Sequence, residues 1–409
     1  MKRAVVGVIV VALALVVVAT TATAQSKNAA TTTTAAASSR GVTATSIKVG
    51  GMGNALVYGG ADVGAKARFQ RANDAGGING RTINYTGYTD DGGVPANATP
   101  TATKLVQNDG VFAVVPAVTD DFTASTYLVQ QKVPYFGWGL SSNFCGNDYG
   151  FGFTGCLVPD GVASNAWGVL VAKVFGTKSS GRAAAIVTEN SPVGQYELKS
   201  LTAGVRSAKL QVVYGKTSLG VPATADLNAL AKAILTSNGG KSPDAVFVVG
   251  TPSNVVGLQQ ALSANGFLGV FTNRIEYAPD LVAPAIGAIV LTQTAPTESA
   301  PQNPAMAQLI ADVQKVAPGQ PIDQAVVAGY WSADLFLAAV QKAGKNLTTQ
   351  TLLNAANHNF TYQVANTVGP TKFPAAHTLP APCGALVASN GTAYTVKVPY
   401  TCGRIVPAK

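Results

Sequence analysis

The sequence predicts an α/β fold made of two doubly wound, Rossmann-like lobes with parallel-rich sheets. Short runs rich in Val, Ile and Phe alternate with segments of helical periodicity through most of the 409 residues. Several of these runs are continuously apolar, which is typical of parallel strands covered on both faces. The alternation restarts after a loop near residue 160, which indicates two units of similar size, near 43–160 and 163–295.

The first unit is punctuated by residues that end or begin helices. Gly76-Gly77 closes one helix, Pro95 suits the first turn of another, and Thr119-Asp120-Asp121 offers N-cap residues for a third. The expected elements are strand 46–50, glycine-rich loop 51–60, helix 61–75, strand 81–88, helix 95–108, strand 111–115, helix 122–131 and strand 134–138.

The second unit repeats this alternation, and a helical group follows it. Its expected elements are helix 163–175, strand 183–187, helix 194–207, strand 210–214, helix 226–238, strand 244–249, helix 253–265 and strand 269–272. Helices are then expected over 304–316, 323–343 and 348–356, and a closing hairpin over 385–397. The simplest packing returns the late helices to the first unit, because the hairpin alone could not bury them.

The N-terminus has the pattern of a secretory signal peptide. Lys2 and Arg3 precede an apolar run from Ala4 to Ala19, and Ala22-Thr23-Ala24 supplies a small-residue cleavage site. The run is shorter than the roughly 20 residues of a membrane-spanning helix. We therefore expect cleavage after Ala24 and export to the periplasm, cell envelope or extracellular space. An uncleaved anchor is the alternative. The polar, small-residue tract 25–42 is expected to be a flexible tether.

The four cysteines suit an exported protein with disulfides. Cys145, Cys156, Cys383 and Cys402 allow three pairings. We favour the pairing of neighbours, which closes a loop over 146–155 and a segment over 384–401. The second segment contains Ser389-Asn390-Gly391, a hairpin signal.

Composition argues against several classes of function. The net charge of +9 is spread over single Lys and Arg residues, so no nucleic-acid partner is expected. Gly51-Met52-Gly53 begins a dinucleotide fingerprint, but Leu56 occupies its third glycine position. Metal and phosphate-loop motifs are absent, and we expect no cofactor. The two histidines, His358 and His377, are the best candidates for a hydrolase, although surface or packing roles are favoured.

Small polar residues follow the predicted strands repeatedly. In open α/β sheets, ligands bind at the carboxyl ends of the strands, where helix N-termini present free N–H groups. Helix capping requires the same residue types and is the favoured explanation of any single loop, but five such loops on two units favour ligand binding. These loops carry Gly53-Asn54, Thr119-Asp120, Leu140-Ser141-Ser142, Glu189-Asn190-Ser191 and Gly250-Thr251.

The order of these motifs resembles the branched-chain amino-acid binding proteins, the type I periplasmic solute-binding components of ABC importers. The most specific match is Ala72-Asn73-Asp74-Ala75-Gly76-Gly77-Ile78-Asn79-Gly80, which precedes a strand. Asp90-Asp91, the helix with Thr103-Lys104-Leu105-Val106 and the strand after Val133-Pro134 extend it. A weaker match lies at 261–266. The resemblance covers about 46–400.

The resemblance implies two lobes that are joined by three hinge crossings and close on a solute. Lobe 1 would comprise 43–161 and 296–372, and lobe 2 would comprise 162–295 and 373–409. It also implies a non-enzymatic, monomeric protein that binds a small molecule and delivers it to a membrane ABC permease. A sensing module for a signalling receptor is the alternative, and a hydrolase is disfavoured.

By position, the resemblance assigns ligand contacts to the loops of both lobes. The assigned residues are Thr119, Asp120, Leu140, Ser141, Ser142, Ser191, Val193 and Thr251, and we add Asn54 and Tyr58 of the glycine-rich loop. Val193 and Thr251 replace the aromatic residues of the family. Tyr58, Phe122, Trp138 and Tyr277 are candidates for an apolar pocket, although core packing is favoured for Trp138.

The position of the family's acidic residue, which often pairs with a ligand ammonium, falls on Arg274, with Glu276 two residues later. If Arg274 faces the cleft, its guanidinium favours a carboxylate or another anion. If Glu276 faces the cleft instead, an amino acid is possible. The sequence therefore predicts a small polar or acidic ligand, either an amino acid, a carboxylate or an amide.

Overall fold

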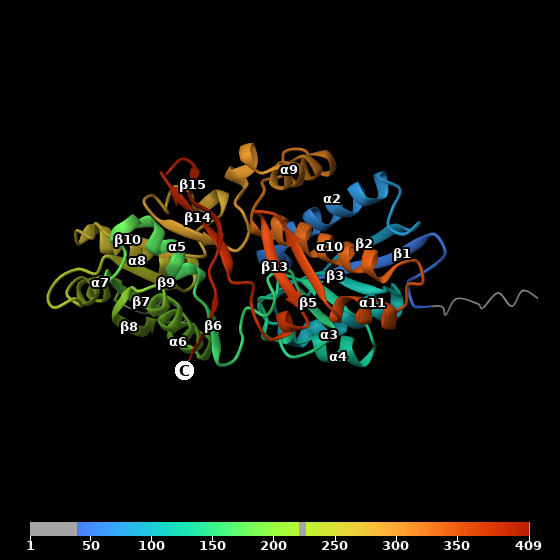
Figure 1. Ribbon diagram of the computed structural model, residues 1–409, viewed down its shortest axis with the longest axis horizontal. Coiled ribbons are helices and arrows are strands. Elements are labelled where there is room, and N and C mark those ends of the chain that lie inside the picture. Colours follow the sequence, from blue (N-terminus) through green and yellow to red (C-terminus); the bar gives the residue numbers. More distant parts are fainter. Residues whose placement is uncertain (1–38, 221–225, 409) are drawn as a thin grey trace, which may run out of the picture. The chain divides into compact units, whose positions relative to one another are not determined.

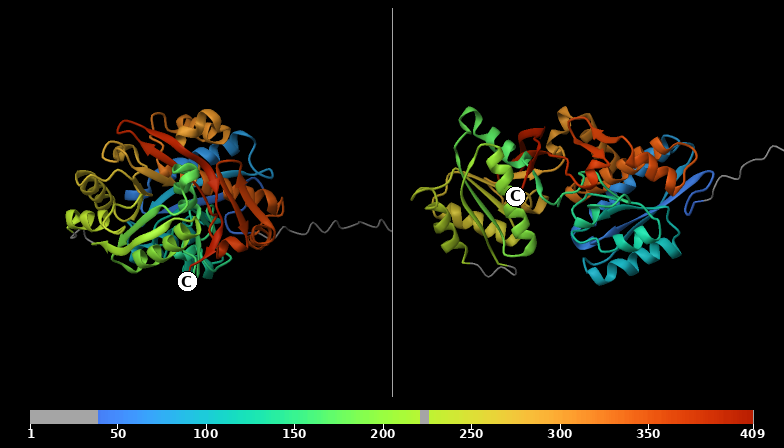
Figure 2. Two further views of the ribbon diagram at one scale, coloured as in Figure 1. Left: turned by 60° about the vertical axis from the view of Figure 1, so that its left-hand side comes forward. Right: turned by 60° about the horizontal axis from the view of Figure 1, so that its bottom comes forward.

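The computed structural model describes residues 39–220 and 226–408. The expected signal peptide, 1–24, and most of the expected tether, 25–42, lie outside the described residues. Among the described helices, none is both long enough and apolar enough to cross a bilayer. Most strands belong to two separate sheets, and helices flank each sheet on both faces (Figure 1 and Figure 2).

The first sheet is parallel throughout and has the order β2-β1-β3-β4-β5. Its central strand is buried on both faces: Val115 contributes to one core and Val114 to the other. This explains why the sequence there is a continuous apolar run. The strands are β1 (Ser46–Gly53), β2 (Thr82–Asp90), β3 (Ala113–Val118), β4 (Tyr135–Gly137) and β5 (Gly150–Gly152).

Helices from two distant parts of the sequence cover the first sheet. One face is covered by α2 (Gly60–Asp74), α9 (Pro304–Val316), α10 (Gln324–Ala343) and α11 (Thr349–Asn357). The other face is covered by α3 (Pro95–Thr103), its π-helical continuation η1 (Lys104–Asn108), and α4 (Ser125–Gln130). The late helices thus return to the first unit, as the packing argument predicted.

Glycines set the close approach of α2 and α10. A Cβ on Gly64 would lie 1.9 Å from the Val326 carbonyl oxygen, and a Cβ on Gly329 would lie 2.0 Å from that of Ala61. Both distances are far shorter than any real contact of a methyl group. The two helices can therefore pack backbone against backbone only because these positions lack side chains.

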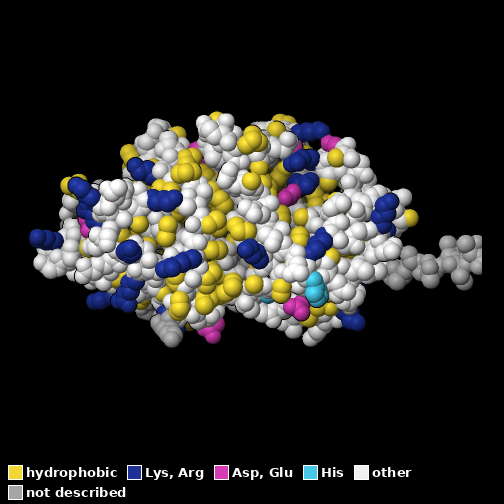
Figure 3. Space-filling model, viewed as in Figure 1, with side chains coloured by type: hydrophobic (Ala, Val, Ile, Leu, Met, Phe, Trp, Pro, Cys, Tyr) yellow, Lys and Arg dark blue, Asp and Glu magenta, His cyan; other side chains and the backbone are white. Residues whose placement is uncertain are grey.

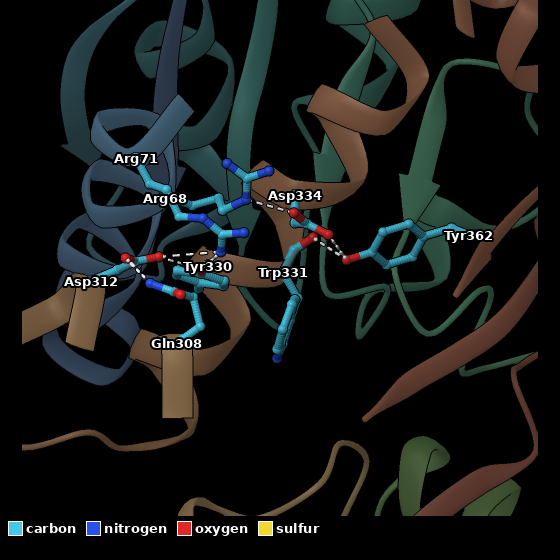
Figure 4. Close-up of polar contacts among 8 residues, drawn as sticks. All are labelled: Arg68, Arg71, Gln308, Asp312, Tyr330, Trp331, Asp334 and Tyr362. Carbon is cyan, nitrogen blue, oxygen red and sulfur yellow. Dashed lines mark hydrogen bonds and ion pairs between the residues drawn. The ribbon is translucent and has the colours of Figure 1, made fainter. Parts of the chain in front are cut away.

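A polar network joins α2, α9 and α10 (Figure 4). Asp312 of α9 accepts hydrogen bonds from Tyr330 of α10 at 2.6 Å and from Gln308 at 2.8 Å. Arg71 of α2 donates to the Tyr330 hydroxyl at 2.8 Å. Beside this group, Asp334 pairs with Arg68 at 2.5 Å and accepts from Tyr362. The network fixes three helices by charge-assisted hydrogen bonds.

The second sheet has the order β15-β14-β11-β10-β9-β7-β8, in which β14 runs antiparallel to both of its neighbours and the other strands run parallel to one another. Helices α5 (Ala166–Val174) and α6 (Pro192–Ser207) cover one face, and α7 (Leu227–Leu235) and α8 (Pro252–Ala264) cover the other. The strands are β7 (Ala183–Glu189), β8 (Gln211–Leu219), β9 (Ala245–Val249), β10 (Val270–Asn273), β11 (Ile289–Thr292), β14 (Cys383–Ser389) and β15 (Tyr394–Cys402).

Smaller elements complete the described chain. Two short antiparallel pairs are formed by β12 (Phe360–Val364) with β13 (Val368–Phe373) and by β6 (Val162–Ser164) with β16 (Ile405–Pro407). The short helix α1 (Ala55–Tyr58) follows β1. The 3₁₀ turns are η2 (Ser142–Phe144), η3 (Gly176–Lys178), η4 (Pro279–Leu281), η5 (Thr297–Gln302) and η6 (Ala375–His377).

The chain passes between the two sheet systems three times: after β5, after β11 and after β13. Both favoured disulfides are present, Cys145–Cys156 and Cys383–Cys402. The first fastens the loop after β4 to the crossing after β5, and the second joins the first residue of β14 to the last residue of β15, at the end of the hairpin next to the crossing after β13. Two lobes joined by three crossings are therefore the architecture of this chain.

The elements differ from the sequence expectations mainly at their ends. The helix expected from 163 begins at Ala166, because 162–164 pairs with β16 instead. The strand expected over 210–214 extends to Leu219, and only 125–130 of the helix expected over 122–131 is α-helical. The closing hairpin turns at Ser389-Asn390-Gly391 as predicted.

Candidate ligand-binding site

The candidate site is built on loops at the carboxyl ends of strands in both sheets. In lobe 1 these loops follow β1, β3 and β4, and in lobe 2 they follow β7, β9 and β10. Because neighbouring strands run parallel, loops that follow them emerge at the same edge of each sheet. Residues far apart in the sequence are thereby gathered at one edge.

Tyr58 and Asp120 form the polar contact of lobe 1. Asn54 caps α1, with its side-chain oxygen accepting the Leu56 N–H at 3.1 Å, and so positions Tyr58 on the same turn. The Tyr58 hydroxyl donates to Asp120 Oδ1 at 2.8 Å. Burial, and then the Asp120 carboxylate, raise the pKa of Tyr58 far above its ordinary value. Tyr58 therefore stays protonated and keeps donating to Asp120.

Arg274 forms the polar contact of lobe 2, immediately after β10. One of its terminal nitrogens lies 2.5 Å from Glu197 Oε1 on α6, and 32% of the Arg274 side chain is exposed. Burial lowers the Arg274 pKa, but the combined effects of Glu197, of Asp120 in lobe 1 and of Tyr196 outweigh burial and raise it. Arg274 is thus permanently cationic, with donors left over beyond the single one that Glu197 uses.

Electrostatic interaction connects the two lobes at this point. The charge of Arg274 lowers the pKa of Tyr58, against the larger effect of burial, and Asp120 acts on Arg274 in return. The structure therefore joins Tyr58 to Asp120 in lobe 1 and Arg274 to Glu197 in lobe 2, and the pKa effects between the two pairs indicate that they influence each other.

Glu276 lies in the interior of lobe 2. Its residue is fully buried, and its Oε2 accepts from the Asn273 side chain. Oε1 has no hydrogen-bond partner among the described residues, and burial raises the pKa of Glu276 to about 7. Of the two charged residues left open by the sequence, Arg274 is accessible and Glu276 is not, because the chain turns after Asn273.

Several other candidates have local structural roles. Ser191 caps α6 by accepting the Gly194 N–H at 3.0 Å, and buried Ser141 accepts the Phe122 N–H at 3.0 Å. Thr119 is also buried. Leu140 is half-buried, whereas Ser142, Val193 and Thr251 are exposed. The Thr251 N–H donates to Glu189 Oε1 at 2.6 Å, so two of the expected loops of lobe 2 are joined directly.

Aromatic side chains connect Tyr58 with the crossing after β11. The Trp138 ring meets the Tyr58 ring edge-on at 6.3 Å and stacks on Phe153 at 6.3 Å. Trp138 Nε1 donates to Gln293 of the crossing after β11 at 2.5 Å. Trp138, Phe153 and Tyr277 line a cavity of about 10 Å³ there, which has room for about one water molecule. Phe122 belongs instead to the core under β3.

Sequence reasoning missed Glu197, Phe153 and Gln293. Glu197 lies in mid-helix and Gln293 in a crossing, so neither carries a motif. The one available signal was the cation itself, because an Arg at a partly buried strand end requires an acidic partner.

The histidines bond to oxygens away from these residues. His358 Nδ1 lies 2.8 Å from the Asn354 carbonyl oxygen. His377 lies between the Gly150 carbonyl oxygen, at 3.0 Å, and the Asn357 side-chain oxygen, at 2.6 Å. On the face drawn in Figure 3, most Lys and Arg side chains lie singly.

The sequence profile described as periplasmic binding protein matches residues 50–393, most of the chain. The chain belongs to the periplasmic binding protein family. It is therefore a solute-binding protein of the exported class to which the loops and lobes had pointed. A search of curated proteins found no match.

Solved structures share the fold. A fatty acid ABC transporter substrate-binding protein from Thermomonospora curvata is 20% identical, with a TM-score of 0.63, and the match covers 90% of this chain and 95% of that one. A possible leucine/isoleucine/valine-binding protein from Rhodopirellula baltica is 18% identical, with a TM-score of 0.64 and coverage of 88% and 98%. An ABC transporter solute-binding protein from R. palustris in complex with benzoate is 16% identical, with a TM-score of 0.62 and coverage of 88% and 98%.

Proposed function

We propose that this binding protein captures a small organic carboxylate between its lobes and delivers it to an ABC permease. The accessible cation at the end of β10 carries this proposal: Arg274 is partly exposed where Glu276 is buried. A forked guanidinium with unused donors binds a carboxylate by two parallel hydrogen bonds. The names of two solved relatives, which mention a fatty acid and benzoate, support a ligand of this class.

Closure follows from contacts that the ligand makes to both lobes. A carboxylate on Arg274 contacts lobe 2, while the exposed Ser142 in the loop after β4 is a donor on lobe 1. Only a ligand that binds the closed state better than the open one shifts the population toward closure. The proposal includes cleavage after Ala24, action as a monomer and the absence of turnover. The sensing module remains the alternative use of the same site.

The test compares acids with their amino-acid counterparts. Binding of 4-methylpentanoate and leucine, and of 3-phenylpropanoate and phenylalanine, is measured by isothermal titration calorimetry. We expect each deaminated acid to bind at least tenfold more tightly, because an ammonium group beside Arg274 is repelled. Tighter binding of the amino acids would place their ammonium on Asp120 and overturn the proposal.

Arg274→Met tests the residue itself. We expect the affinity for the best acid to fall more than tenfold, because the variant removes the charge and the fork. Arg206→Met is the matched control, since Arg206 is an exposed arginine in the last turn of α6 in the same lobe. Equal affinities of wild type and Arg274→Met would exclude Arg274 from the site.

A further inference from the structure

Three large apolar side chains, Leu56, Val57 and Val193, are exposed to solvent in the segments that follow β1 and β7, and we call them the rim of the candidate site. On lobe 1, Leu56 is 93% exposed and Val57 is 55% exposed, and both belong to the short helix that positions Tyr58. On lobe 2, Val193 is 64% exposed. Isolated exposed apolar residues are ordinary on a protein surface, but a group of them at a binding site indicates an apolar partner.

Their place in the fold ties these side chains to the polar contacts of the site. Leu56 and Val57 directly precede Tyr58 at the carboxyl end of β1, and the Tyr58 hydroxyl donates to Asp120 in the loop after β3 at 2.8 Å. Val193 lies one helical turn before Glu197 on α6, so it shares a helix face with the partner of Arg274. Lobe 2 therefore presents an exposed apolar side chain near Arg274, the group that a carboxylate would bind, and lobe 1 presents two beside Tyr58.

The inner end of the site has little room for the apolar part of a ligand. Behind Tyr58, the cavity between Trp138, Phe153 and Tyr277 measures about 10 Å³ and takes about one water molecule. A methylene chain or a ring does not fit there. The apolar part of a ligand held by Arg274 must therefore extend the other way, toward the exposed rim.

We infer that the ligand is an amphiphilic carboxylate, whose head binds Arg274 and whose hydrocarbon chain lies between Leu56, Val57 and Val193. This inference rests on the proposed function and adds the ligand class. The chain would cover side chains that are otherwise exposed, and the burial of both surfaces would stabilise the closed state. Leu56 and Val193 then determine specificity for chain length, without contacting the carboxylate head.

The test is a series of straight-chain acids measured by calorimetry below their micelle concentrations. The probes are butanoate, octanoate and dodecanoate, with benzoate as a compact acid and octan-1-ol as a chain without a carboxylate. Each fully buried methylene raises affinity about fourfold. We expect dodecanoate to bind at least a hundredfold more tightly than butanoate, and octan-1-ol to bind at least tenfold more weakly than octanoate.

Variants at the exposed apolar residues distinguish contacts with the hydrocarbon chain from binding of the carboxylate head. Leu56→Ser and Val193→Ser should each weaken dodecanoate binding about tenfold and change butanoate binding less than twofold. Leu268→Ser is the matched control, because Leu268 is 97% exposed but lies at the opposite end of the second sheet, before β10. It should change neither affinity. All three positions are exposed, so the variants are expected to fold.

The possible outcomes distinguish this inference from the proposed function. If butanoate and benzoate bind but affinity does not rise with chain length, the inference of an amphiphilic ligand is wrong, while the proposed carboxylate site stands. The same holds if Leu56→Ser weakens butanoate and dodecanoate equally. Failure of every acid to bind would overturn both proposals.

Discussion

Glu276 gives the protein a pH-dependent stability that one isosteric substitution should remove. Its carboxyl group is fully buried, one oxygen lacks a partner among the described residues, and burial raises its pKa from an ordinary 4.5 to about 7. The folded state therefore holds this proton more tightly than the unfolded chain does. The stabilisation of the folded state by this proton is complete below pH 4.5 and is lost as the pH rises to about 7.

The size of the effect follows from the two pKa values. The interval from 4.5 to about 7 corresponds to about 3 kcal/mol of unfolding free energy. Glu276→Gln cannot ionise, so its stability relative to wild type should rise by about that amount between pH 4 and pH 8. The Gln amide keeps an oxygen to accept from Asn273, so the variant is expected to fold.

Urea unfolding at several pH values, followed by fluorescence, measures this difference. The comparison with wild type is essential, because His377 acts in the opposite direction. Burial lowers the pKa of His377, so its contribution is lost as the pH falls. Asp280→Asn, at an exposed carboxylate nearby, is the control and should keep the wild-type slope. A constant difference between Glu276→Gln and wild type across this pH range would refute the reasoning.

Three further substitutions test the packing. Gly64→Ala should cost at least about 2 kcal/mol because its methyl group meets the Val326 carbonyl oxygen, whereas Gly215→Ala, where a Cβ meets only ordinary contacts, should be nearly neutral in urea unfolding. Tyr330→Phe should cost about 1–3 kcal/mol by leaving buried Asp312 short of a donor (Figure 4), and Tyr214→Phe, with only a 3.5 Å contact to Ser218, serves as its control. Replacing Cys383 and Cys402 together by Ser should lower the free energy of unfolding by about 3 kcal/mol relative to wild type without reductant. If the double variant and oxidised wild type are equally stable, this disulfide has no structural role.

The sequence predicted the two doubly wound lobes because their signals are local. Continuous apolar strands such as Val111–Val115, and glycine or proline at helix ends, report burial and turns without knowledge of distant contacts. The β6–β16 pair could not be predicted in this way, since Val162 and Pro407 lie far apart in the sequence and neither segment is strongly patterned.

The site was predicted less completely, for a geometric reason. Arg274 and Glu276 follow the end of β10, where strand alternation no longer fixes the direction of side chains, so the sequence left both open. The hydroxyl of Ser141 looked like a ligand donor and instead holds the Phe122 N–H, because binding loops and capped loops use the same residue types. Glu197 required the fold to bring α6 beside β10.

The bonding between two of the crossings restricts how the lobes can move. Cys156, held by its disulfide to Cys145, donates its N–H to Ala376 in the crossing after β13, and the Ala381 N–H returns to the Thr154 carbonyl oxygen. The crossings after β5 and after β13 are therefore hydrogen-bonded to each other, so a change in one requires a change in the other. Because these two crossings are bonded to each other, we expect the lobes to open mainly by rotation about the axis that this pair and the crossing after β11 define. A ligand that contacts both lobes then needs to restrain only this one rotation.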